Sequence, residues 1–215
     1  MPMISATRRA AGLAAVVLVI APSIAAASLQ PGTPAKPNPV RLTVTFGWSQ
    51  LGEDVTSFNL WFPSGSVYNG AKYPKCSAAT LAQDGPTACP KASIVGSGTG
   101  TAYADTTITR PQITVVNGGG STVYFYTILN NPARVQEPIV GHITRLHGRF
   151  VYELSATIPQ NLQIVAGVPI NLTSMTVTAG KGNWIALGAA PAGIKVQTGY
   201  ANGATSSYQL WVQNL

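Results

Sequence analysis

The densest group of ionisable side chains in the sequence is basic and consists of Arg145, His147 and Arg149, at a spacing of two. In a continuous strand these side chains would project from one face, whereas in a hairpin they would cluster near the tip. Either arrangement makes a positive patch suited to the carboxylate or phosphate groups of an acidic cell-surface polymer. The patch is a candidate ligand-binding site, although a solvated turn is the favoured interpretation.

Aromatic side chains offer a second candidate site, because a sugar ring can stack on an exposed indole. The four tryptophans are Trp48, Trp61, Trp184 and Trp211. Each lies within an apolar alternation, so core or inter-sheet packing is expected for the set. Phe58, Leu60 and Phe62 alternate along one segment, and Trp61 is offset from them by one position. Trp61 should therefore face the other way, and it is the tryptophan we most expect to be exposed, unless a second sheet covers it.

Groups suited to catalysis are scarce. The chain has two histidines and six acidic residues, and it lacks the Gly-x-Ser-x-Gly motif of many serine hydrolases. Glycoside hydrolysis needs two carboxylates that flank one bond. Glu153 is the most notable carboxylate because it lies within the alternating segment 150–154, and we expect it to point outward into solvent. The sequence therefore predicts no catalytic residue, no metal site and no cofactor.

Gly96, Gly98 and Gly100 alternate in a segment that resembles a phosphate-binding loop. Such a loop must open a helix whose first amides face the phosphate, but residues 101–104 continue a strand pattern. We predict instead that the glycines leave one strand face bare, so that another backbone or a large aromatic side chain packs closely against it.

The elements that must position these residues are short strands. Candidate strands are residues 41–48, 58–62, 93–104, 112–116, 122–129, 138–144, 149–158, 171–178, 183–187, 194–200 and 206–212. Turns at Asn117–Gly120 and Asn202–Gly203 predict hairpins and hence antiparallel neighbours. One helix is predicted at Ala78–Gln83, capped by Ser77 and closed by Gly85. The pattern predicts an all-β fold, an antiparallel β-sandwich or jelly roll of about ten strands with one short helical turn.

The only two cysteines, Cys76 and Cys89, flank the predicted helix. An even pair in an exported chain predicts a disulfide, which would close a loop that has little apolar material of its own. Metal or redox chemistry is a poor alternative, because the spacing is not Cys-x-x-Cys and both histidines are distant in the sequence.

The N-terminus predicts export. Arg8 and Arg9 precede an apolar run over Ala10–Ile20, and Ala25 and Ala27 supply an A-x-A cleavage site, so residues 1–27 are predicted to be a signal peptide. The run is shorter than the roughly 20 residues of a membrane-spanning helix, and no later segment is as long. We expect a mature protein without a membrane span, secreted or associated with the cell envelope.

The mature chain is predicted to have a proline-rich flexible segment at 28–40 and a single domain at 41–215. Loss of Arg8 and Arg9 lowers its formal net charge from +7 to +5. Charged residues make up 9% of the chain and are scattered, without the dense basic stripe that a phosphate backbone requires. Nucleic acid is therefore not expected as a partner.

The segment around the cysteines resembles a known family. It reads Tyr73-Pro74-Lys75-Cys76-Ser77, then Gly85-Pro86, Ala88-Cys89-Pro90 and Gly96-Ser97-Gly98. This run is similar to an uncharacterised family of exported β-proteins from actinobacteria, in which a Cys-containing helical turn closes on Cys-Pro and leads into a Gly-Ser-Gly strand. The resemblance implies export, the disulfide and the β fold. It supplies no catalytic residue.

These observations predict an exported, non-enzymatic β-sandwich that serves as a structural or binding component of the cell envelope or the secreted fraction. Binding of a cell-wall or extracellular glycan is the sharper form of this prediction. The competing class is a hydrolase of an extracellular polysaccharide or wall polymer, which would show two converging carboxylates in a concave pocket. A subunit that assembles through a long uncovered edge strand is a third class.

Overall fold

The computed structural model describes residues 40–45, 54–187 and 192–212. The predicted signal peptide, most of the proline-rich segment and Trp48 lie outside the described residues, and so does the side chain of Trp211. Val40 already belongs to the first strand, one residue before the predicted start of the domain. Within the described ranges, no helix is long and apolar enough to cross a membrane.

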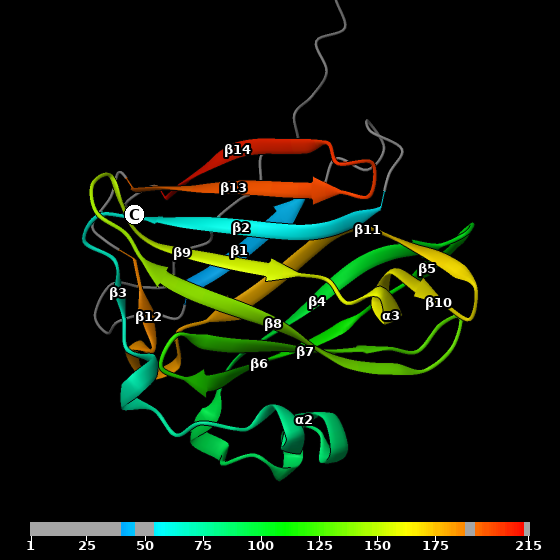
Figure 1. Ribbon diagram of the computed structural model, residues 1–215, viewed down its shortest axis with the longest axis horizontal. Helices are drawn as coiled ribbons and strands as arrows, with labels where there is room; N and C mark the ends of the chain where they lie inside the picture. Colours follow the sequence, from blue (N-terminus) through cyan, green and yellow to red (C-terminus); the bar gives the residue numbers. More distant parts are fainter. Residues whose placement is uncertain (1–39, 46–53, 188–191, 213–215) are drawn as a thin grey trace, which may run out of the picture.

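Twelve strands of the described chain form one sheet, and all their pairings are antiparallel (Figure 1). The main path runs β1 (Val40–Thr45), β11 (Val168–Ala179), β4 (Ile94–Ala104), β6 (Gln112–Gly119), β7 (Thr122–Leu129), β8 (Val135–Arg145), β9 (Phe150–Thr157), β2 (Val55–Pro63), β13 (Ala192–Tyr200) and β14 (Thr205–Val212). Beside this path, β5 (Thr107–Thr109) pairs with β4 and β10 (Ile164–Val165) with β11, and β3 (Val67–Tyr68) and β12 (Ile185–Ala186) form a separate pair.

The sheet folds over on itself, so that two layers enclose one core. In Figure 1, β2, β9 and β8 lie in front, and β1, β11 and β4 pass behind them. Phe58 of β2, Phe125 of β7 and Met175 of β11 all belong to the same buried cluster. The rings of Phe58 and Phe125 pack edge to face with centroids 5.7 Å apart. The predicted antiparallel sandwich with one short helix is therefore confirmed.

Alternation of apolar and polar residues explains most strand boundaries, and the predicted strands agree with the observed ones to within a few residues. Residues 183–187 are the clearest exception. Lys181–Asn183 forms a 3-10 turn, η4, and Asn183 has φ +72°, so only Ile185–Ala186 remains extended. A single turn of helix, α3 (Gln160–Gln163), was not predicted, because one turn is too short to leave a helical period in the sequence.

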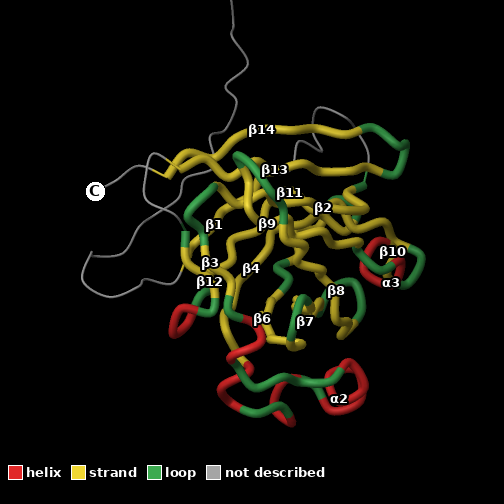
Figure 2. The backbone as a smooth tube through the Cα atoms, turned by 60° about the vertical axis from the view of Figure 1, so that its left-hand side comes forward, coloured by secondary structure: helices red, strands yellow, loops and turns green. Residues whose placement is uncertain are grey.

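The cysteine-containing segment forms a loop over the outer surface of the sheet. Cys76 and Cys89 are disulfide-bonded, as predicted, and the helix between them, α2 (Ala78–Asp84), begins at the predicted cap, where the Ser77 hydroxyl accepts from Thr80 N at 3.0 Å. Two 3-10 turns complete the loop, η2 (Pro86–Ala88) and η3 (Lys91–Ser93). Figure 2 shows this loop beneath β6 and β7.

The disulfide loop covers an apolar cluster that is separate from the main core. Leu81 of α2 is fully buried together with Val116 of β6 and with Tyr124 and Tyr126 of β7. A two-layer sandwich needs only one apolar face per layer. Here the outward face of β6 and β7 is apolar too, and the loop is what removes it from water.

Asn117 connects the disulfide loop to the core. The sequence placed it in a hairpin turn, but this prediction is wrong: β6 continues to Gly119, and Asn117 is a fully buried strand residue. Its Oδ1 accepts from Trp184 Nε1 at 2.9 Å. Its Nδ2 donates to the carbonyl oxygens of Gly70, Tyr73 and Pro74 at 3.0, 3.2 and 3.0 Å. The hairpin itself is confirmed, with the turn shifted to Gly120 and Ser121.

The glycines of β4 are explained by packing, as predicted. A Cβ at Gly96 or Gly98 would collide with the carbonyl oxygens of Thr178 and Thr176 on the neighbouring strand β11. The segment continues as strand to Ala104 and opens no helix. Glycine therefore permits the close approach of two backbones here.

Aromatic side chains close one end of the sandwich. The Tyr68 ring packs edge to face against Trp184 and Tyr152, with centroids 5.2 and 6.1 Å away. Its hydroxyl is buried and has no hydrogen-bond partner among the described residues. Burial raises the pKa of Tyr68 from 10.0 to about 12.

This pKa predicts a loss of stability in alkali that Tyr68→Phe should reduce. Above pH 10 the phenol ionises in the unfolded chain but stays protonated in the fold, so the free energy of unfolding should fall as the pH rises toward 12. The phenyl ring that replaces the phenol does not titrate, and the other tyrosines are common to both proteins. Urea denaturation at about pH 9 and about pH 11 should therefore show a smaller pH-dependent loss for the variant. Equal losses would contradict this assignment.

Candidate ligand-binding face

The outward surface of the front layer has two parts. Over β6 and β7 it is apolar and lies under the disulfide loop. Over β8, β9, β2 and β13 it is polar. Core residues alternate along these strands with outward-facing residues, most of which are polar, such as Asn59 and Ser155. Trp61 lies within this polar part and is only partly exposed, as its offset from Phe62 predicted.

One row of this face runs through Trp61 across five strands. Strand register pairs Thr144 with Glu153, Glu153 with Trp61, Trp61 with Lys195, and Lys195 with Gln209. Neighbouring strands are about 4.8 Å apart, so a short ligand could contact several members of the row. Glu153 points outward, as predicted, and lies directly beside the indole.

Lys195 packs against the Trp61 ring. Its Nζ lies 4.5 Å from the centroid of the indole ring, in cation–π geometry. The indole therefore has a carboxylate on the β9 side and an ammonium on the β13 side. Both Glu153 and Lys195 are partly exposed, so a ligand from solvent can reach either charge.

A second row lies one step along the strands and carries hydroxyl, carboxamide and imidazole groups. Register places His142, Ser155, Asn59, Gln197 and Ser207 next to one another. A shallow groove includes His142, Ser155 and Asn59 of this row, and its other lining residues are Ser57, Val140, Ala156, Thr157 and Pro159. Carboxamides and hydroxyls both donate and accept hydrogen bonds, which is the chemistry that sugar hydroxyls require.

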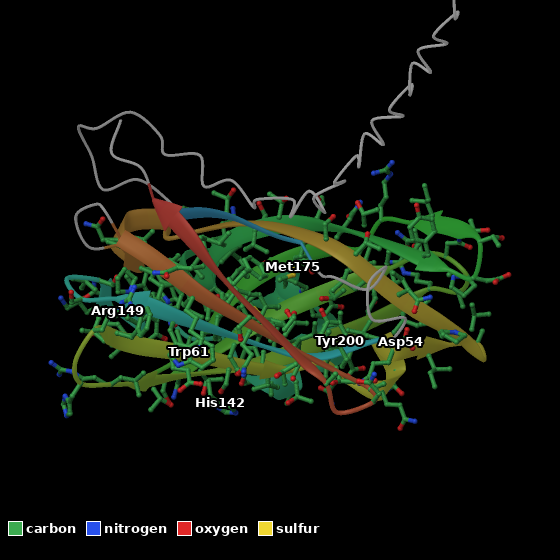
Figure 3. All side chains as sticks on the ribbon, turned by 90° about the horizontal axis from the view of Figure 1, so that it is seen from above. Asp54, Trp61, His142, Arg149, Met175 and Tyr200 are labelled. Atoms are coloured by element: carbon green, nitrogen blue, oxygen red, sulfur yellow. A yellow bond between two sulfur atoms is a disulfide. The ribbon has the colours of Figure 1, made fainter. Side chains whose placement is uncertain are left out.

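The basic triplet lies at one end of this face. Arg145 is the last residue of β8, and His147 and Arg149 lie in the turn to β9, so they occupy a hairpin tip rather than one continuous strand. All three are exposed, and the Arg149 guanidinium lies 5.4 Å from the Phe150 ring centroid. Figure 3 shows Trp61 and His142 on the same long side of the molecule, with Arg149 at one end.

The tip is held close to the strand that carries Trp61. Ser64 N, just past the end of β2, donates to Arg149 O at 3.0 Å. Ser64 is three positions after Trp61, and three positions of extended chain span roughly 10 Å. The structure thus places the two sequence candidates, the basic triplet and Trp61, along one strand direction. Trp184, by contrast, is a core residue.

The chain matches no family model, no curated protein and no solved structure among those compared with it. The resemblance of the cysteine segment to an exported actinobacterial family stays a prediction. Within the described ranges, no three His, Cys, Asp or Glu side chains gather as a metal site would need.

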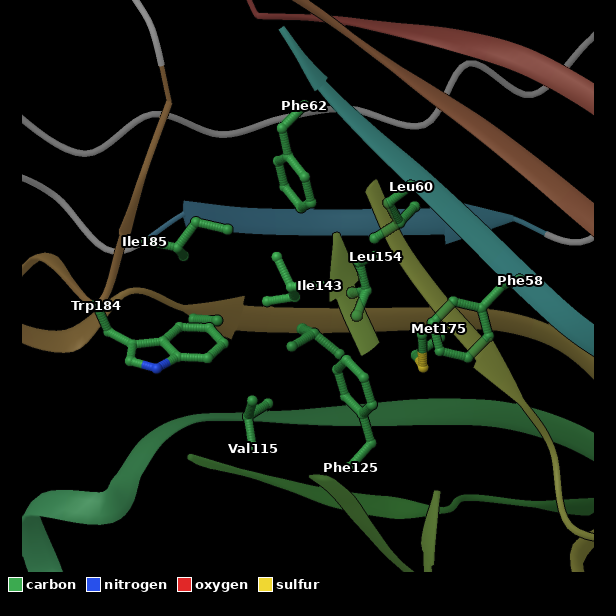
Figure 4. A pocket seen from close by; sticks show the side chains of 12 residues that line it. Phe58, Leu60, Phe62, Val115, Phe125, Ile143, Leu154, Met175, Trp184 and Ile185 are labelled. Carbon is green, nitrogen blue, oxygen red and sulfur yellow. The ribbon is translucent and has the colours of Figure 1, made fainter. Parts of the chain in front are cut away.

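The sandwich interior offers a different kind of space. A cavity of about 60 Å³ lies between the layers and is lined only by apolar and aromatic side chains, including Phe58, Leu154 and Met175 (Figure 4). A site that orients a ligand needs a few convergent polar groups. The Trp61 face has such groups, and the cavity wall has none in its described lining.

Sequence reasoning missed Lys195, Gln197 and Asn59 as members of the site. The alternation of 194–200 does place Lys195 opposite to Ile194 and Val196, so its outward direction was readable. Its position beside Trp61 was not, because β13 and β2 are far apart in the chain and nothing local encodes their register.

Proposed function

We propose that the protein is an exported, non-enzymatic β-sandwich that binds a glycan through the face around Trp61, as a binding or structural component of the cell envelope or the secreted fraction. The observation that carries the proposal is the Trp61 row. An indole, a carboxylate and an ammonium lie side by side there, next to a row of carboxamides and hydroxyls.

This composition suits a sugar chain. The apolar face of a pyranose ring can pack on an indole, while its hydroxyls bond to side chains such as Asn59, Ser155 and Gln197. An antiparallel sheet face exposed to water needs polar residues but not a tryptophan. Trp61 is therefore the residue that a merely solvated face does not explain.

The arrangement of carboxylates favours binding over hydrolysis. A glycosidase holds two carboxyl groups about 5 to 9.5 Å apart. Glu153 is the carboxylate of the Trp61 row, whereas Asp54 lies seven residues from Trp61 along the chain, roughly 23 Å in an extended strand. Among the described residues of the two rows, Glu153 is the single carboxylate, so these rows can orient a sugar but lack the second group for acid–base hydrolysis.

The test is a glycan-binding screen with the purified mature protein and the variant Trp61→Ala. We expect the variant to lose at least about tenfold in affinity for the glycans that the parent binds, because a tryptophan central to an interface often contributes about 1.4 kcal/mol or more. Trp61→Phe should keep part of the affinity. Measurement is by isothermal titration calorimetry, with thermal unfolding to show that the variants are folded.

Tyr103→Ala is the matched control, since Tyr103 is a partly exposed aromatic on β4 in the other layer. It should bind as the parent does. No glycan bound by the parent, or equal affinity of the parent and Trp61→Ala, would refute the proposal. Fractionation of cultures would show separately whether the protein is retained on the cell wall or released.

A further inference from the structure

We infer that the Trp61 face selects anionic glycans, and that Lys195 is the residue that selects them. This inference rests on the proposed function and adds the ligand class. Its starting observation is that the Lys195 ammonium occupies a position over the indole ring. A sugar ring that stacks on that face of Trp61 must take the same position.

Lys195 has no competing partner in the described part of the chain. Its ammonium makes the contact with the Trp61 ring, and no described carboxylate lies within salt-bridge distance of it. Glu153 is on the far side of Trp61 in the row. An indole binds a cation more weakly than a carboxylate, sulfate or phosphate does, because it offers a quadrupole and no full charge.

The consequence is a difference between neutral and acidic ligands. A neutral sugar displaces the ammonium from the ring, and the displaced ammonium then has only water as a partner. An acidic sugar displaces it and then pairs with it through a charge-assisted hydrogen bond. Lys195 therefore opposes the stacking of neutral sugars and favours that of acidic ones.

The surrounding charges fix the orientation of such a ligand. Glu153 repels an anionic group on the β9 side of Trp61 and accepts hydrogen bonds from sugar hydroxyls there. The anionic group then faces Lys195 on the β13 side. Further along the strand direction, Arg145 and Arg149 at the hairpin tip give a longer acidic chain a second cationic contact.

The experiment compares polygalacturonate with its carboxyl-reduced, neutral form. We expect the parent protein to prefer the acidic polymer by about tenfold, which corresponds to about 1.4 kcal/mol. Lys195→Gln should abolish this preference by weakening acidic binding, and should leave neutral binding equal or stronger because the ring face is freed. Lys195→Arg should keep the preference. Thermal unfolding should confirm that each variant is folded.

Two control variants distinguish the effect of Lys195 from the effect of losing positive charge elsewhere on the protein. Lys91→Gln removes the same charge from an exposed site on η3 of the disulfide loop and should leave the preference unchanged. Arg145→Ala combined with Arg149→Ala should lower acidic binding only in long oligomers. A preference that survives Lys195→Gln, or that falls equally in Lys91→Gln, overturns the inference.

The outcomes also distinguish this inference from the proposed function. If the parent binds both polymers equally and Trp61→Ala abolishes both, the glycan-binding face stands and the anionic selectivity is wrong. If the parent binds only neutral glycans, the selectivity is wrong as well. If it binds no glycan, both are wrong.

Discussion

Asn117→Ala is expected to destabilise the protein by about 4 kcal/mol, the largest effect of any single substitution predicted here. The side chain is fully buried, and both its amide nitrogen and its amide oxygen are hydrogen-bonded. Its two amide hydrogens are shared among three carbonyl oxygens, and its oxygen accepts the indole N–H of Trp184. Truncation removes the acceptor of the buried Trp184 N–H and the donor to three carbonyl groups, of which Gly70 O keeps its bond from Tyr73 N.

The loss is large because it affects two parts of the fold at once. Trp184, 3% exposed, would keep a buried N–H without an acceptor, which costs about 1–3 kcal/mol. The segment Gly70–Pro74, which leads into the disulfide loop, would lose the donor that fixes its carbonyl groups. One strand residue thus holds both the aromatic end of the core and the entry to the loop.

The measurement is urea denaturation, with Asn130→Ala as the control. Asn130 is exposed just after β7, and its truncation should change stability by less than about 0.5 kcal/mol. Combining Asn117→Ala with Trp184→Phe, which removes the indole N–H, should show a coupling of about 1 kcal/mol or more between the two sites. A loss below about 1 kcal/mol for Asn117→Ala would contradict the role assigned to it.

Asn117 also shows where sequence reasoning fails. Followed by three glycines, it has the local signature of a turn, and a turn does begin three residues later, at Gly120. Its burial depends on carbonyl groups that lie 43 to 47 residues away in the chain and on Trp184, 67 residues away. Local propensity predicts that the hairpin exists, and long-range contacts decide which residue is buried.

The candidate site was predictable in its parts and not in its assembly. Alternation correctly placed Trp61 and Glu153 on the outward faces of their strands, because a period of two fixes the face of every residue once one is buried. The row Glu153–Trp61–Lys195 depends on β2 lying between β9 and β13. Pairings between such distant segments leave no local trace in one sequence, so the site emerges only from the fold.

Removal of the disulfide by Cys76→Ser together with Cys89→Ser is expected to cost about 3 kcal/mol, the second largest effect. The bridge spans a sequence separation of 13 and closes a loop whose helix has seven residues, too short to be stable alone. Both cysteines are buried in an apolar cluster, so the measured loss combines the lost cross-link with the burial of two serine hydroxyls.

The effect should be concentrated in the loop and the surface it covers. Val116, Tyr124 and Tyr126 belong, with both cysteines, to a cluster separate from the main core, which contains neither cysteine. Hydrogen exchange should therefore show faster exchange across 76–93, while the amides of β2, β9 and β13 stay protected. The parent under reducing conditions should behave as the double variant does.

A uniform loss of protection over the whole sheet would contradict this division. It would mean that the loop is required for the sandwich to form, and not only for covering one side of it. Glycan binding gives an independent readout, because the disulfide loop packs on β6, β7 and β8, whereas Trp61 and Lys195 belong to β2 and β13. The double variant should therefore keep the affinity of the parent at temperatures where both are folded, although its free energy of unfolding is lower.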